Sequence, residues 1–138
     1  MRAARERSAA MKVLLGTCAL IWATMSPAAL SPSARETIAD EANVILVSAA
    51  SAWEIATKVR LGKLPGAEKL ERDFLAVMAA AGYTLLDLDT ASALRAGRLT
   101  ADHRDPFDRM LAAQALGQDI PILSPDALFD QFGVRRIW

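Results

Sequence analysis

Segments with the pattern of buried strands alternate with segments with the pattern of helices along the whole chain of 138 residues. The apolar runs "KVLL" at 12–15 and "VILV" at 44–47 have no polar alternation, as expected for strands covered by helices on both faces. Further strands are expected at 83–88, 120–123 and 134–138. Parallel neighbouring strands need helical crossovers, so this alternation predicts an α/β sandwich with a mainly parallel central sheet.

The helices predicted between these strands have recognisable starts and ends. Ser31 as N-cap and Pro32 at the first helical position begin one helix, and Gly82 ends another. In the helix expected over 48–64, the spacing predicts one buried side made by Trp53, by Ile55 or Ala56, and by Val59. The expected helices cover 18–24, 31–41, 48–64, 67–82, 90–99 and 105–118, with a helical turn at 125–133.

Composition restricts the class of protein further. With 53% hydrophobic and 23% charged residues, we expect one globular domain over 11–138, preceded by a disordered extension over 1–10. The single cysteine, Cys18, excludes an internal disulfide. The formal net charge is zero, which argues against nucleic-acid binding by a bulk positive field but permits local basic groups beside an acidic site.

Several carboxylates are expected at one edge of the predicted sheet. Asp126 follows the strand at 120–123, Glu54 lies early in the helix after 44–47, and Asp105 and Asp108 begin a helix. Functional clefts of open α/β sheets lie outside the carboxyl ends of the strands. Each acid also has an ordinary alternative: Asp108 as a helix-start residue, Asp126 as an N-cap and Glu54 as a solvated side chain.

If these acids converge, the repulsion between their negative charges must be compensated. Two carboxylates ~4 Å apart repel by roughly 4 kcal/mol at an effective dielectric constant of ~20. They must therefore bind a cation, hold a proton or stay apart. Hard oxygen ligands in a partly open site suit Mg²⁺ or Mn²⁺, and such ions can support phosphodiester hydrolysis.

Four stretches together resemble the PIN-domain proteins of the VapC toxin type, in that family's order and spacing. They are "SAASAWEIATKVRLGKL", "HRDPFDRMLAAQA", "ILSPDALFDQFGV" and "RRIW". The resemblance covers 11–138 and implies a PIN-like three-layer α/β/α sandwich. It also implies a ribonuclease dependent on Mg²⁺ or Mn²⁺, usually a homodimer, silenced by a VapB-like antitoxin that inserts a peptide into the acidic cleft.

The resemblance assigns roles to individual residues. Glu54, Asp108 and Asp126 match the second, third and fourth acids of the family, and Asp105 is an additional acid that this subgroup tends to carry. Ser124 matches the hydroxyl neighbour of the fourth acid. Two lysines, Lys58 and Lys63, are expected near the phosphate path, and the alternative interpretation is that both are solvated charges at the end of a helix. Apart from the resemblance, His103 is expected to be a loop residue, with a role as general base as the minor alternative.

The first acid is missing. Where the family usually has an aspartate after its first strand, this chain has Gly16, followed by the matching Thr17 and by Cys18 in place of the common histidine. Glycine offers no ligand, and each ~1.4 kcal/mol of lost transition-state stabilisation lowers the rate tenfold. Two functions therefore remain open: a weakened metal-dependent ribonuclease, or an inactive PIN-fold module that binds antitoxin or RNA without cleavage.

The apolar stretch Met11–Met25 has a second interpretation as a bacterial export signal, with Arg2, Arg5 and Arg7 before it. Cleavage after Ala28 would remove "KVLL", which the resemblance places at the centre of the sheet. The stretch is also shorter than the ~20 residues of a membrane-spanning helix. We therefore expect a cytoplasmic bacterial protein without a membrane partner.

Overall fold

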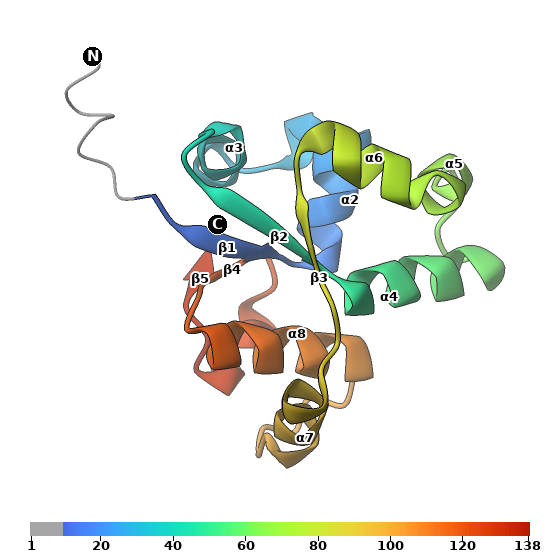
Figure 1. Ribbon diagram of the computed structural model, residues 1–138. Coiled ribbons are helices and arrows are strands. Elements are labelled where there is room, and N and C mark those ends of the chain that lie inside the picture. The colour runs from blue at the N-terminus through green and yellow to red at the C-terminus, as the bar shows by residue number, and fades with distance from the viewer. Residues whose placement is uncertain (1–9) are drawn as a thin grey trace.

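A parallel sheet forms the middle of the molecule in the computed structural model, which describes residues 10–138 (Figure 1). Within that range the sheet has five strands in the order β3-β2-β1-β4-β5, and every neighbouring pair is parallel. Leu14 of the central strand aligns with Leu46 on one side and Ile122 on the other. The strands are β1 (Lys12–Leu15), β2 (Val44–Ser48), β3 (Thr84–Leu86), β4 (Ile122–Leu123) and β5 (Arg136–Ile137).

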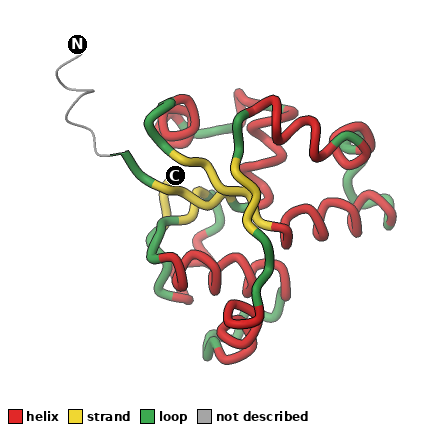
Figure 2. Tube along the Cα trace, viewed as in Figure 1, coloured by secondary structure: helices red, strands yellow, loops and turns green. Residues whose placement is uncertain are grey.

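Helices cover both faces of this sheet and supply the parallel crossovers (Figure 2). The predicted three-layer α/β/α arrangement is therefore confirmed. The helices are α2 (Thr17–Met25), α3 (Pro32–Ala39), α4 (Ala49–Arg60), α5 (Glu68–Arg72), α6 (Phe74–Ala81), α7 (Thr90–Arg98) and α8 (Pro106–Gln118), with short 3₁₀ helices η1 (Pro27–Ala29) and η2 (Ala127–Phe132).

Alternate residues of the strands enter two separate hydrophobic cores. Val13 and Leu15 of β1 face a core completed by α2, α3, α5 and α6. Leu14, between them, faces a second core completed by α8 and η2. Successive strand residues point to opposite faces, so a run without polar alternation is what a sheet buried on both sides requires.

Two sequence predictions for the helices were wrong. The helix expected over 67–82 is divided into α5 and α6 at Asp73, whose backbone leaves the helical region (φ −103°, ψ 22°). Trp53, expected on the buried side of α4, is 56% exposed, whereas Ile55 is fully buried. Two residues two positions apart lie on nearly opposite sides of a helix, so only one of them can face the core.

The stretch Met11–Met25 forms the central strand β1 and the helix α2, both of which contribute fully buried side chains. This placement agrees with the interpretation as a core segment. Among residues 10–138, none of the helices has the length and apolarity needed to cross a membrane. The extension expected over 1–10 lies, apart from Ala10, outside the described residues.

Candidate acidic site

The carboxyl ends of three neighbouring strands carry the predicted site. Gly16 follows β1, Ser48 ends β2 and Ser124 follows β4. Because the strands are parallel, these ends meet at one edge of the sheet, where α2, α4 and η2 begin. We call the four predicted acids at this edge, Glu54, Asp105, Asp108 and Asp126, the acidic rim.

Ser48 fixes α4 and α8 relative to each other at this edge. Its hydroxyl accepts a hydrogen bond from the Ala50 N–H, which caps α4, and donates to Oε1 of the buried Gln114 on α8. The Gln114 amide in turn donates to the Asp87 carbonyl at 3.0 Å. These bonds hold the two helices that carry three of the four rim acids.

Glu54 is the most deeply buried acid of the rim, with only 5% of its surface exposed. Its Oε2 accepts from Nζ of Lys58, one helical turn later, at 2.5 Å. Its Oε1 is the one buried side-chain N or O atom in residues 10–138 that has no hydrogen-bond partner. A buried carboxylate oxygen without a partner is costly, so Oε1 marks a place where a donor or cation would be stabilised.

Asp105 and Asp108 lie together at the start of α8. Asp105 is the N-cap, and its Oδ1 accepts from the N–H groups of Phe107 and Asp108. Oδ2 of Asp108 lies 2.7 Å from Nε2 of His103. Burial raises the pKa of the Asp108 carboxyl, the His103 hydrogen bond opposes this, and the charges of Asp105 and Glu54 raise the pKa further. These electrostatic interactions join three rim acids in one neighbourhood.

Lys58 supplies the positive charge in this neighbourhood. Its pKa is raised chiefly by the hydrogen bond to Glu54, partly opposed by burial, and further raised by the charges of Glu54, Asp105 and Asp108. Lys63, the second predicted lysine, lies exposed beyond the end of α4 and has no ion pair among the described residues. The structure therefore brings one of the two lysines to the rim.

Asp126 lies at the opposite side of the rim. Its Oδ1 accepts from the Leu128 N–H and caps η2, while its own N–H donates to Oγ of Ser124 at 3.0 Å. Cys18 connects it electrically to the other acids: burial raises the pKa of the Cys18 thiol, and the charges of Asp126 and Glu54 raise it further. The thiol is thus within electrostatic range of both Asp126 and Glu54.

Gly16, where the resemblance leads us to expect an acid, lies in a crowded place. Its N–H donates to the Leu123 carbonyl at 2.9 Å. A Cβ atom at this position would lie 3.1 Å from the Leu123 oxygen and 3.2 Å from the Ser124 Cβ. The backbone angles (φ −67°, ψ 157°) suit any residue, so space rather than conformation limits substitution.

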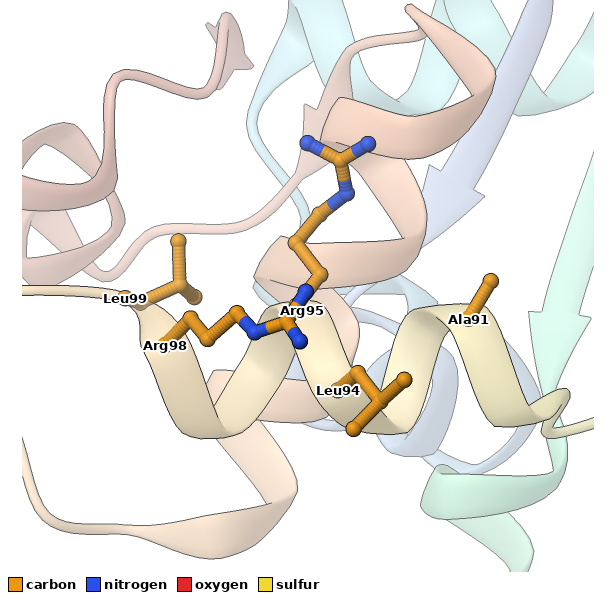
Figure 3. A pocket seen from close by; sticks show the side chains of 5 residues that line it. All are labelled: Ala91, Leu94, Arg95, Arg98 and Leu99. Carbon is orange, nitrogen blue, oxygen red and sulfur yellow. The ribbon is translucent and has the colours of Figure 1, made fainter.

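A cleft of about 240 Å³ opens beside the rim. Thr17, whose hydroxyl lies 2.9 Å from that of Ser51, forms part of its wall. A larger hollow of about 430 Å³ lies on α7, and all five of its lining residues belong to that helix or its end (Figure 3). That hollow contains no rim acid, whereas the smaller cleft includes Glu54 and is lined by Thr17, Cys18, Ile21, Trp22, Glu54, Lys58 and Leu64.

The rim as it stands does not fit the predicted Mg²⁺ or Mn²⁺ ion. The free Glu54 Oε1 favours a cation, and the acids are hard oxygen donors. However, Gly16 supplies no ligand, Lys58 already neutralises Glu54, and one oxygen each of Asp105 and Asp126 caps a helix. Within residues 10–138, no three His, Cys, Asp or Glu side chains form a group that could hold a metal ion.

Sequence reasoning missed two features of the site. His103 lies in a loop, as expected, but its direct contact with Asp108 was not anticipated. Trp53 and Phe107, each one residue before a rim acid, form an aromatic contact at the surface. The one available signal was position: His103 stands five residues before Asp108, and both aromatics adjoin predicted site acids.

Comparison with known proteins identifies related sequences and folds. A family model described as PIN domain matches residues 13–134. The fold is similar to that of a chain from the VapBC2 crystal structure of Rickettsia felis, bound to a DNA fragment from the promoter, with a TM-score of 0.67, 15% identity and coverage of 92% of this chain and 98% of that one.

Two further solved structures are similar in fold. FitAcB from Neisseria gonorrhoeae has a TM-score of 0.59 and 17% identity, over 91% of this chain and 96% of that one. FitAB bound to the IR36 DNA fragment has a TM-score of 0.58 and 17% identity, over 91% and 93%. Comparison with curated protein sequences gives no match.

Proposed function

We propose, from the premise that this chain belongs to the PIN-domain family, that it is a VapC-like protein that binds RNA at the acidic rim and hydrolyses it only slowly. The observation that carries the proposal is the set of residues at the carboxyl edge of the sheet. Glu54, Asp105 and Asp108 lie close enough there to influence one another electrostatically, which supports the proposal, and Gly16 stands where the resemblance expects a further acid. The descent is that of a ribonuclease, and the missing ligand weakens its chemistry.

PIN domains in general depend on a divalent metal ion. Such an ion, which we expect to be Mg²⁺ or Mn²⁺, would supply charge neutralisation for phosphodiester hydrolysis. In this chain the Lys58 ammonium provides part of that neutralisation instead, at 2.5 Å from Glu54. A single lysine lowers the repulsion between the acids but does not replace the bound ion in hydrolysis, so slow cleavage is the expected result.

A protein partner is part of the proposal. The similar folds come from the VapBC2 and FitAB complexes, each solved bound to DNA. By analogy we infer a VapB-like antitoxin for this chain, a homodimeric assembly and a location in the bacterial cytoplasm. The open cleft beside Glu54 and Lys58 is where a peptide of such an antitoxin would be expected to insert.

An inactive binding module is the second candidate function. It is favoured by the pairing of Glu54 with Lys58 and by the helix-capping roles of Asp105 and Asp126. In that case the rim would bind RNA or antitoxin without any cleavage. The two candidates differ in one measurable quantity, the rate of RNA cleavage.

Cleavage of a structured RNA in Mg²⁺ or Mn²⁺ tests the proposal. We expect slow cleavage by the present chain, faster cleavage by orders of magnitude with Gly16→Asp, and none with Glu54→Gln. Lys12→Ala, an exposed position at the amino end of β1 and so at the other end of that strand from Gly16, serves as the control that leaves the rate unchanged. Cleavage at an unchanged rate in Glu54→Gln would refute a role of the rim in hydrolysis, and zero cleavage by the present chain would establish the inactive module.

A further inference from the structure

An aromatic pair lies exposed at the surface beside the acidic rim. The ring centroids of Trp53 and Phe107 are 4.8 Å apart, with an interplanar angle of 78°, so the rings meet edge to face. Trp53 nevertheless remains 56% exposed, which leaves much of the indole open to solvent. A large aromatic side chain that is held in place by a neighbour and left uncovered is suited to binding a planar ligand.

The pair spans the same two helices as two of the rim acids. Trp53 precedes Glu54 on α4, and Phe107 precedes Asp108 on α8. Glu54 points into the protein, whereas Trp53, about 100° further around the helix, points outward. The aromatic contact therefore lies on the solvent side of the acids, next to Glu54 on α4 and next to Asp108 on α8.

An unpaired arginine, Arg60, lies on the face of α4 that carries Trp53. Arg60 is seven residues after Trp53, which places both side chains on one face of the helix, about 10 Å apart along its axis. Arg60 is exposed and makes no ion pair or side-chain hydrogen bond within residues 10–138. The outer face of α4 thus presents an open aromatic surface followed by an unpaired positive charge.

We propose that Trp53, supported by Phe107, is a stacking platform for an unpaired nucleobase of RNA, with Arg60 contacting the backbone of the same strand. This inference rests on the proposed binding of RNA and adds how the strand is held. Every base has a π-face, so stacking on an aromatic side chain binds single strands with little sequence preference. A base paired within a duplex does not offer its face, so the platform selects unpaired segments.

Binding of a short, labelled single-stranded RNA of mixed sequence, without metal so that no cleavage occurs, tests the platform by fluorescence anisotropy. Trp53→Ala should weaken binding about 5- to 150-fold, Trp53→Phe should retain most of the affinity, and Trp53→Leu should behave like Trp53→Ala. Leu61→Ala removes a side chain of similar exposure from the end of the same helix and should change nothing.

The salt dependence of RNA affinity distinguishes the contribution of stacking on Trp53 from that of the charge of Arg60. Replacing Arg60 by alanine should reduce the slope of log affinity against log salt concentration by about 0.7, as expected for one lost phosphate contact on a single strand. Trp53→Ala should lower the affinity without changing this slope. The same RNA annealed to its complement should bind more weakly to the unchanged protein and be insensitive to Trp53→Ala.

The possible failures are distinguishable. If the unchanged chain does not bind the RNA at all, RNA binding itself is refuted, and the proposed function falls with the platform. If RNA binds and Trp53→Ala binds equally well, the platform alone is wrong. If sedimentation shows that Trp53→Ala converts a dimer into a monomer, the aromatic pair is a contact between two copies of the chain and the platform is overturned.

Discussion

At the scale of single residues, the lack of space around Gly16 limits the introduction of a carboxylate at this position. An aspartate there would bring its Cβ to 3.1 Å from the Leu123 carbonyl oxygen, closer than side chains normally pack. We expect Gly16→Asp to lower the free energy of unfolding by about 1–3 kcal/mol in the absence of metal, as overpacked sites do. Urea unfolding in EDTA measures this loss.

Gly16→Ala separates crowding from charge in this experiment. Alanine adds the Cβ without a carboxylate, so it should show the crowding cost but no gain in affinity for Mn²⁺ by calorimetry. Gly16→Asp should show both. Equal stability of all three proteins would mean that the end of β4 shifts without cost and that the contact at Gly16 does not restrict the site.

Asp108 makes the stability depend on pH. Because burial raises its pKa in the folded protein, ionisation costs stability above that folded value, and the cost disappears as pH falls below the unfolded value of about 3.9. We therefore expect Asp108→Asn to be more stable than the unchanged chain near pH 7, with the difference shrinking as the solution is acidified.

Urea unfolding from about pH 3 to about pH 8 measures this difference. Asp102→Asn, an exposed position in the same loop, provides the matched control and should leave the pH profile unchanged. A lower stability of Asp108→Asn at pH 7 would show that the contact with His103 outweighs the cost of burying the carboxylate.

At the scale of secondary structure elements, the start of α8 depends on Asp105. Its carboxylate accepts two backbone hydrogen bonds, so Asp105→Ala should destabilise the protein by about 1 kcal/mol, whereas Asp105→Ser keeps a capping oxygen and should lose little. Thermal unfolding of both variants is the measurement. Equal losses in the two would assign the effect to the charge of Asp105 rather than to its capping bonds.

The elements themselves follow largely from local sequence. The apolar runs and the helix starts at Ser31 and Asp105 predicted their positions closely, because capping and strand burial are local properties. The break at Asp73 could not be predicted. One core receives Leu70 from α5 and Phe74 and Met78 from α6. A single continuous helix would bring the same side chains to that core with the same spacing, so the sequence pattern does not distinguish one helix from two.

The site could be predicted only in part for a related reason. Parallel strand ends meet at one edge, which brings Glu54 and Asp126 into the same region, and the four-residue spacing of Glu54 and Lys58 permits their ion pair. The placement of His103 against Asp108 and the outward direction of Trp53 depend on how α4 and α8 pack together. That packing is a tertiary property that no local pattern encodes.

At the scale of the whole molecule, the balance of charge bears on what the protein binds. The chain has 16 basic and 16 acidic residues, so no net field attracts a polyanion. The proposed binding of RNA must then rely on local groups, among which Lys58 faces the acids and Arg60 faces solvent. Affinity for RNA should consequently depend on a few contacts and show a shallow salt dependence.

The response of the whole fold to metal is the last prediction. A ligand that binds only the folded state stabilises it by RT ln(1 + [L]/Kd), about 2.7 kcal/mol at a hundredfold excess over Kd. Because the rim does not fit a metal ion, Mg²⁺ or Mn²⁺ should leave the Tm of the present chain nearly unchanged, and EDTA should not lower it. Gly16→Asp should instead gain roughly 3–5 °C for each kcal/mol of binding.

Potassium chloride at matched ionic strength is the necessary control, because screening alone relieves repulsion within the acidic rim. Only a rise specific to the divalent ion counts as binding. If the present chain gains as much Tm in Mn²⁺ as Gly16→Asp, then Glu54, Asp108 and Asp126 bind the ion without a fourth acid. Lys58 must in that case leave Glu54 when the metal enters, since the ammonium and the ion compete for the same carboxylate.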